Sequence, residues 1–267
     1  MTGSSPRRIA LLGDPVAHSL SPRMHNAGFR AMGLDAVYVA TRCSSEDLGR
    51  VMRSLAAAGG GGNITVPHKL AATGYGRGDA RVDRLGIANL FVGTEDGVCL
   101  GNSDVDGVLA LVGSLHAVPS GWAIVGTGGS ARAVAAAAHE RGAAVASISR
   151  SPERAAAFET WCRQIGCTVT ERDACEMLVN ASPLGLHADD PLVVDLAAWP
   201  RLTAVLDLTY RQHGTTALVA LARERGLEAA DGLEMLLAQG VACWTWWFPG
   251  VEPPVGVMRD ALLGIDP

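Results

Sequence analysis

Lysine is nearly absent from this sequence. Of its 22 basic residues, 21 are arginine, and the single lysine is Lys69. A guanidinium stays protonated in proteins, whereas a lysine amine can give up its proton when its surroundings lower its pKa. Codon bias toward arginine would leave one lysine by chance, and a lysine whose amine reacts would be retained. Composition alone does not decide between these two interpretations.

The sequence also lacks long hydrophobic runs and an excess of positive charge. No apolar run approaches the ~18 residues that a membrane span needs, and the run after Arg7 and Arg8 is too short for a secretory signal. The net charge of −5 gives no reason to expect a nucleic acid or an anionic membrane as a partner. We therefore expect a cytoplasmic protein that binds neither.

Metal-binding cysteine patterns are missing as well. The six cysteines form no CxxC pair and no zinc-type spacing, so we expect free thiols in a reducing cytosol and no metal site. Hydrophobic residues make up 48% and charged residues 18% of the 267 residues. These fractions are typical of a well-packed soluble enzyme with one large or two ordinary domains.

Hydrophobic periodicity in the first part of the chain predicts a βαβαβ unit that ends in a hairpin. Ser21 is the expected N-cap of a helix with Pro22 at its first position, and Ser44 with Asp47 resembles a capping box before a second helix. The expected strands are 8–12, 36–40 and 62–66, and the hairpin joins 90–93 to 98–101.

The remainder alternates strand-like and helix-like segments, which predicts an α/β fold with a doubly wound, Rossmann-type parallel sheet over residues 106–237. A C-terminal helix that includes 240–247 is expected to return to the first domain, residues 1–105 and 238–267, with its tryptophans Trp244, Trp246 and Trp247 as core contacts. The expected strands are 122–126, 144–149, 167–170, 176–179, 203–207 and 228–230, and the helices are 130–141, 152–164 and 215–225.

A glycine-rich segment, GTGGSA at residues 126–131, follows an expected strand and opens an alanine-rich helix. Glycines let the backbone approach a pyrophosphate closely, and the first N–H groups of a helix point at its phosphates. A tight turn without a ligand would use the same glycines. The residues that predict a dinucleotide site are Gly126, Gly128, Gly129, Ser130 and Ala131.

Charge at the end of the next expected strand indicates which dinucleotide binds. Ser149 ends that strand, and Arg150 and Arg154 follow it. Sites for NAD place an acidic residue here to bind the ribose 2′-hydroxyl, whereas two guanidinium groups suit a 2′-phosphate. We predict NADP as the cofactor, and a solvated arginine pair is the alternative.

Polar side chains gather at three expected strand ends of the first domain. A single residue of this kind is usually a cap or a turn residue, but three clusters on one side of a small sheet suit a small polyhydroxylated carboxylate. The clusters are Ser19 with Ser21, Thr65 with Lys69, and Asn89 with residues 102–104.

Taken together, these segments resemble the shikimate dehydrogenase family over about residues 8–248. Two segments are similar to its most specific motifs: residues 13–26 (GDPVAHSLSPRMHN) and residues 63–69 (NITVPHK), which carries the family's catalytic lysine. Further matches follow in the family's order at residues 101–104, 126–131, 149–151, 180–185 and 231–240.

The resemblance implies reversible, NADP-dependent reduction of 3-dehydroshikimate to shikimate, a step of aromatic amino acid biosynthesis on the chorismate pathway. Lys69 and Asp104 would be the catalytic acid–base pair. The substrate would be bound by Ser19, Ser21, Thr65, Asn89, Tyr210 and Gln239. The nicotinamide end of the cofactor would lie against Asn180, Ala181, Ser182, Leu208, Gly232 and Met235.

Departures from the family's pattern leave the ring substrate open. Leu90 stands where a threonine usually follows the asparagine, Ser103 replaces a threonine, and residues 211–213 lack the proline that usually follows the tyrosine. Quinate or an aminoshikimate is therefore an alternative substrate. A lyase that uses Lys69 as a Schiff-base nucleophile and a non-catalytic NADP-binding regulator are alternatives of other classes. The oligomeric state is also open, with a homodimer among the candidates.

Overall fold

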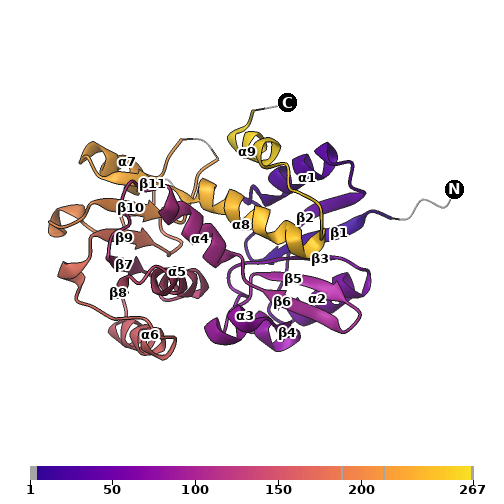
Figure 1. Ribbon diagram of the computed structural model, residues 1–267, viewed down its shortest axis with the longest axis horizontal. Helices are drawn as coiled ribbons and strands as arrows, with labels where there is room; N and C mark the ends of the chain where they lie inside the picture. The colour runs from indigo at the N-terminus through magenta and orange to yellow at the C-terminus, as the bar shows by residue number, and fades with distance from the viewer. Residues whose placement is uncertain (1–4, 188, 213, 266–267) are drawn as a thin grey trace. The chain divides into compact units, whose positions relative to one another are not determined.

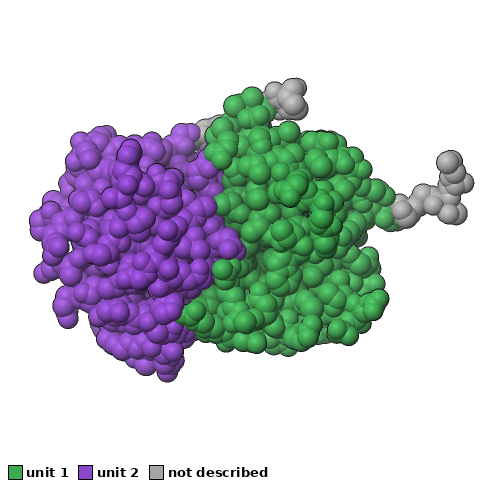
Figure 2. Space-filling view, in the orientation of Figure 1, with its two compact units in different colours: residues 1–103, 237–267 green, residues 104–236 purple. Residues whose placement is uncertain are grey.

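The computed structural model describes residues 5–187, 189–212 and 214–265 (Figure 1). The chain forms two compact units, Met1–Ser103 with Leu237–Pro267 and Asp104–Leu236, which Figure 2 distinguishes by colour. His213 and the outermost residues of the expected first domain lie outside the described residues. Over the described parts of the chain, no helix combines the length and the apolar composition that a membrane crossing requires.

The first unit contains a mixed six-stranded sheet in the order β2-β1-β3-β5-β6-β4. β1 is parallel to β2 and β3, β5 and β6 form an antiparallel hairpin, and β5 also runs antiparallel to β3. The predicted strands and the predicted hairpin are therefore confirmed. The strands are β1 (Arg7–Gly13), β2 (Ala36–Arg42), β3 (Gly61–Ile64), β4 (Arg77–Gly78), β5 (Leu90–Thr94) and β6 (Gly97–Gly101).

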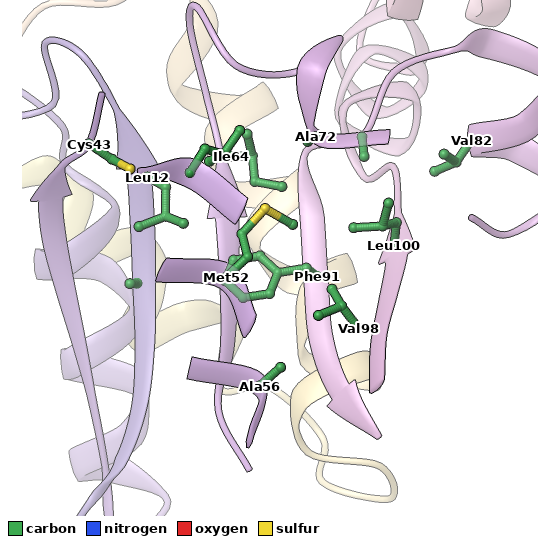
Figure 3. Packing of buried hydrophobic residues seen from close by; sticks show 13 residues of the cluster. Leu12, Cys43, Met52, Ala56, Ile64, Ala72, Val82, Phe91, Val98 and Leu100 are labelled. Carbon is green, nitrogen blue, oxygen red and sulfur yellow. The ribbon is translucent and has the colours of Figure 1, made fainter. Parts of the chain in front are cut away.

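Helices cover both faces of this sheet. On one face, α2 (Leu48–Ala57) packs Met52 against Ile64 and Phe91 in a buried apolar cluster (Figure 3). On the other face lies α1 (Ser21–Ala31), with α9 (Val255–Leu263) packed on it. The C-terminal half of α8 (Gly232–Trp247) contacts α1 at Gly28 and the sheet at Gly61 and Phe91. A short helix, α3 (Ala80–Leu85), and a 3-10 turn, η1 (Ala71–Tyr75), complete the unit.

The side chains expected in the core are found there. Trp244 and Trp247 are fully buried, and the His25 ring, which stacks on Tyr38 at a centroid distance of 4.5 Å, contacts the edge of Trp247. Trp246 is only partly buried, but it lies against Gly101. The six cysteines are free thiols, and only Cys99 among them is not fully buried. The core interpretation of the tryptophans is thus confirmed.

Two predicted helix starts differ in detail. Leu20, not Ser21, is the N-cap residue of α1, and its apolar side chain makes no cap. The Ser21 hydroxyl accepts a hydrogen bond from the Ser19 hydroxyl instead. The Ser44 hydroxyl does accept a hydrogen bond from the Asp47 N–H at 3.2 Å, but α2 begins only at Leu48, after this turn.

The second unit contains a five-stranded, all-parallel sheet in the order β11-β10-β9-β7-β8. The predicted doubly wound sheet is confirmed. Its strands are β7 (Gly121–Val125), β8 (Ala144–Ile148), β9 (Met177–Asn180), β10 (Ala204–Asp207) and β11 (Glu228–Ala230). Its helices are α4 (Asp104–Gly113), α5 (Gly129–Glu140), α6 (Pro152–Gln164) and α7 (Ala217–Glu224), with short turns η2 (Arg172–Ala174) and η3 (Leu196–Ala198).

The predicted strand at 167–170 is wrong. Within it only Val169 makes an isolated bridge to Val145. Gly166, with a φ of +88°, turns the chain just before it, and η2 starts at Arg172 just after it. The extended segment between these turns is too short to form a ladder.

The strand order of the second unit reverses at β7, which has β8 on one side and β9 on the other. In open parallel sheets, ligands bind beyond the carboxyl ends of the strands at such a reversal. Gly126 follows β7 directly and Asn180 ends β9. Both residues therefore lie where this topology favours a ligand.

Candidate functional site

The turn between β7 and α5 has the features of an anion site. Gly126 has a φ of +107°, and a Cβ there would lie 3.0 Å from the Ala181 carbonyl oxygen, so the position requires glycine. Gly128 is the N-cap residue of α5 and supplies no capping side chain, and a Cβ built on it would meet no atom within 4 Å. A helix N-terminus without a side-chain cap, with open space at its N-cap glycine, fits a pyrophosphate.

The two arginines of the predicted 2′-phosphate site lie on the next connection, between β8 and α6. The Ser149 hydroxyl accepts a hydrogen bond from the Ser151 N–H at 3.2 Å, and the Ser151 hydroxyl caps α6 by accepting from the Arg154 N–H at 3.2 Å. Arg150 and Arg154 are both exposed. This ordered turn therefore leaves both guanidinium groups accessible to a ligand.

The loops after β9 and β10 are hydrogen-bonded to each other. The Asn180 side-chain oxygen accepts from the Ser182 N–H at 3.0 Å, and the Asn180 carbonyl accepts from the Leu208 N–H at 2.9 Å. Gly232, at the start of α8, packs so closely that a Cβ would lie 2.3 Å from the Leu208 carbonyl oxygen. The structure thus brings together most of the residues predicted for the nicotinamide end, with Met235 buried one turn into α8.

Two hydroxyls meet at the start of α1 in the first unit. The Ser19 hydroxyl donates to the Ser21 hydroxyl at 3.1 Å and accepts from the Ser21 N–H at 3.2 Å. Ser21 is buried, and Ser19 is partly exposed. Paired hydroxyls of this kind can donate to both oxygens of a carboxylate.

The single lysine follows a tight turn after β3. The Thr65 N–H donates to the Leu12 carbonyl at 2.8 Å, and the His68 N–H donates to the Thr65 carbonyl at 2.8 Å. The Lys69 carbonyl accepts from the Ala88 N–H at 2.9 Å. Lys69 is only 8% exposed, which is rare for a lysine that serves merely as a surface charge.

Ser103 connects two residues that were predicted to bind ring hydroxyls. Its N–H donates to the Asn89 side-chain oxygen at 2.7 Å, and its hydroxyl accepts from the Asn89 amide at 3.1 Å. The same hydroxyl donates to the Gln239 side-chain oxygen at 3.2 Å. These bonds fix the orientation of the Asn89 and Gln239 side-chain amides.

Sequence reasoning placed Ser103 in a polar cluster and noted it as a replacement for threonine but gave it no role of its own, and it did not single out Asn63. The Asn63 amide donates to the Asn89 carbonyl at 3.1 Å, and its oxygen accepts from the Tyr38 hydroxyl at 2.8 Å. Both residues lie inside motifs that the sequence displays. Their polar character at those positions was the signal that could have identified them.

Asp104 and Tyr210 belong to the second unit. Asp104 is the first residue of α4 and is only 5% exposed, and Tyr210 is partly buried in the loop after β10. Lys69 belongs to the first unit.

Comparison with known proteins gives a consistent result. A sequence profile described as the shikimate dehydrogenase substrate binding domain matches residues 11–90, and one described as the shikimate 5′-dehydrogenase C-terminal domain matches residues 232–263. The chain is 40% identical to the shikimate dehydrogenase (NADP(+)) of Rubrobacter xylanophilus, over 96% of this chain and 95% of the relative. It is 38% identical to the protein of the same name from Acidiphilium cryptum, over 96% of this chain and 94% of the relative.

Solved structures agree. The crystal structure of shikimate 5-dehydrogenase from Thermus thermophilus in complex with NADP(H) and shikimate is 30% identical in sequence and superposes with a TM-score of 0.85. The similarity covers 97% of this chain and 99% of that one. The matched segments include the turn of Lys69 and the start of α8, where the site residues described above are found. The chain belongs to the shikimate dehydrogenase family.

Proposed function

We propose that this protein is an NADP-dependent shikimate dehydrogenase that interconverts 3-dehydroshikimate and shikimate. The observation that carries the proposal is the burial of the single lysine, Lys69, in a unit that also holds the Ser19–Ser21 hydroxyl pair and the Asn89–Ser103–Gln239 cluster. An amine, carboxylate-binding hydroxyls and oriented side-chain amides match the groups of a hydroxylated ring acid. The first unit would be the substrate-binding domain and the second the NADP-binding domain.

NADP fits the second unit because no side chain caps the α5 N-terminus and a Cβ on its N-cap residue, Gly128, would meet no atom within 4 Å. These N–H groups would bind the pyrophosphate, and Arg150 with Arg154 would bind the 2′-phosphate. The loops that carry Asn180 to Ser182 and Leu208 would hold the nicotinamide end. When bound, NADP supplies or accepts the hydride.

Side chains of the protein would bind the substrate and transfer the proton. Ser19, Ser21 and Tyr210 would hold the substrate carboxylate, while Thr65, Asn89 and Gln239 would orient the ring through its hydroxyls. Lys69 would give a proton to the oxygen at the 3-position during reduction and remove it during oxidation. Asp104 would orient the amine and bind the same hydroxyl. Such acid–base help is worth about 10²–10⁴ in rate.

A substrate panel tests the proposal most directly. Shikimate, quinate and an aminoshikimate are each supplied with NADP, and NADPH formation is followed by its absorbance. We expect shikimate to give the highest kcat/KM. Faster turnover of another ring would reassign the substrate, and NADPH binding without turnover of any ring would favour the regulator. A cytoplasmic location and a homodimer are predictions for cell fractionation and analytical ultracentrifugation.

A further inference from the structure

A buried carboxylate joins the ends of β9 and β10. Asp207, the last residue of β10, is fully buried, and its Oδ1 accepts three hydrogen bonds. The Asn180 amide donates to it at 2.8 Å, the Thr209 N–H at 3.0 Å and the Thr209 hydroxyl at 2.8 Å. One oxygen atom therefore ties the last residue of β9 to the loop that follows the neighbouring strand β10.

The two oxygens of Asp207 have unequal roles. Oδ2 is also buried, but no residue that the structure describes lies in hydrogen-bonding geometry with it. Burial raises the pKa of Asp207, and the polar groups of Thr216, Thr209 and Asn180 oppose that rise. A buried ionised carboxylate without a paired cation contributes little to stability. The hydrogen bonds that the carboxyl group accepts from Asn180 and Thr209 thus all fall on Oδ1.

The chain passes tightly over this carboxyl group. Gly185 has a φ of +101°, and a Cβ there would lie 3.2 Å from the Thr209 hydroxyl and 3.5 Å from Asp207 Oδ2. The Asn180 amide that donates to Asp207 also donates to the Leu184 carbonyl at 2.8 Å. Residues 180–185 are therefore folded around Asp207 as one compact loop.

This loop reaches the point where the strand order reverses. The Ala181 N–H donates to the Val125 carbonyl at 2.9 Å, and the Ala181 carbonyl lies against Gly126, the first residue of the glycine-rich turn. On the other side, the residue after Thr209 is Tyr210. Asp207 is hydrogen-bonded to Asn180 in one segment and to Thr209 in the other. Any ligand contact that these segments make therefore depends on the conformation that Asp207 gives them.

We propose that Asp207 is a positioning residue for the nicotinamide end of the cofactor: its Oδ1 fixes the loop of residues 180–185 against the turn after β7. The proposal rests on the proposed function only in that this loop borders the nicotinamide. Asp207 itself touches neither cofactor nor substrate in this scheme. Loss of Oδ1 would leave buried donors of Thr209 without a partner, and the loop would be released.

The test separates the nicotinamide end from the adenosine end. Calorimetric titration measures the dissociation constants of NADPH and of adenosine 2′,5′-bisphosphate, which lacks the nicotinamide. For Asp207→Ala we expect NADPH to bind about 10-fold more weakly, with the bisphosphate within about twofold of wild type. Asp207→Asn keeps an acceptor at the Oδ1 position, so NADPH affinity should stay within about threefold.

Two further variants keep the test decisive. Val205→Ala removes buried apolar volume from the same strand, so it should lower the thermal midpoint without changing the ratio of the two dissociation constants. Thr209→Val deletes one donor to Oδ1 with little change in shape, so it should weaken NADPH selectively even if Asp207→Ala does not fold.

The outcomes are distinct. Unchanged NADPH affinity in both Asp207→Ala and Thr209→Val, or equal weakening of both ligands, would overturn the positioning role. An Asp207→Asn variant as weak as Asp207→Ala would overturn the assignment to the acceptor oxygen. A wild-type protein that binds neither ligand would instead refute the proposed function.

Discussion

At the scale of single residues, the proposed chemistry depends on the amine of Lys69. Lys69→Arg keeps the positive charge but replaces the amine with a group that does not release its proton in proteins. We therefore expect kcat to fall by about 10²–10⁴ in this variant, as far as in Lys69→Ala. The measurement is steady-state oxidation of shikimate by NADP. An arginine variant that retains most of the activity would remove Lys69 from proton transfer.

Substitution of Ser19 tests how the substrate carboxylate is bound. Its hydroxyl pairs with Ser21 and would hold a carboxylate that stays unchanged during the reaction. Binding that is equal in the ground state and the transition state affects KM rather than kcat. Ser19→Ala should therefore raise KM for shikimate about 10-fold or more, with kcat within about twofold. A loss confined to kcat would contradict the carboxylate role.

At the scale of elements, β3 leaves no room for a side chain at Gly62. A Cβ there would lie 2.0 Å from the Ala10 carbonyl oxygen on the neighbouring β1. Gly62→Ala should destabilise the protein by about 1–3 kcal/mol or more in urea unfolding, because the paired strands must separate. Gly256→Ala in α9 is the matched control, since a Cβ there meets no atom within 4 Å. The control should be neutral or slightly stabilising, and equal losses would contradict the packing argument.

A second element-scale prediction concerns the connection from α4 to β7 and its contact with β11. The His116 N–H and ring bond to Glu228, and this hydrogen bond, with the carboxylate's charge, raises the pKa of His116 and lowers that of Glu228. The contribution of His116 to folding stability is fully present below its unfolded pKa of about 6.5, and it is lost as pH rises through the raised pKa of the folded state. The glutamate contribution is present above its unfolded pKa of about 4.3 and is lost as pH falls through the lowered folded value.

The stability difference between wild type and His116→Ala should therefore be largest between about pH 4.5 and 6.5 and should shrink above that range. Thermal unfolding across a pH series measures it. The His116 side chain is 94% exposed and that of Glu228 34%, so high salt should reduce the difference. A difference that grows toward alkaline pH would contradict the pairing.

At the scale of the whole molecule, the preference for NADP over NAD should be measurable as a difference in thermal stabilisation of the protein. A ligand that binds only the folded state stabilises it by about 2.7 kcal/mol at 100 times its dissociation constant. Arg150 and Arg154 present two accessible guanidinium groups beside the α6 N-terminus, where NAD-specific sites have an acidic residue. NADPH should therefore raise the thermal midpoint more than NADH at equal concentration. Equal shifts would show that the 2′-phosphate is not recognised.

Much of the fold and part of the site could be predicted from the sequence. The glycine-rich turn, the parallel strands of the second unit and the hairpin were all found where periodicity and turn residues indicated them. These features depend on residues close together in the chain, so short-range patterns suffice. The segment 167–170 failed because its strand character was cut short by turns at both ends.

The sequence by itself determined which chemical groups this protein has: one lysine amine, a hydroxyl pair, and a glycine turn followed by arginines. Only the tertiary structure decided which side chains support them. Ser103 meets Gln239 across 136 positions of the chain, and Asp207 meets Asn180 across 27. Such partners are chosen when packing brings distant strands and helices together and leaves buried polar atoms that must be hydrogen-bonded, and no local pattern encodes that pairing.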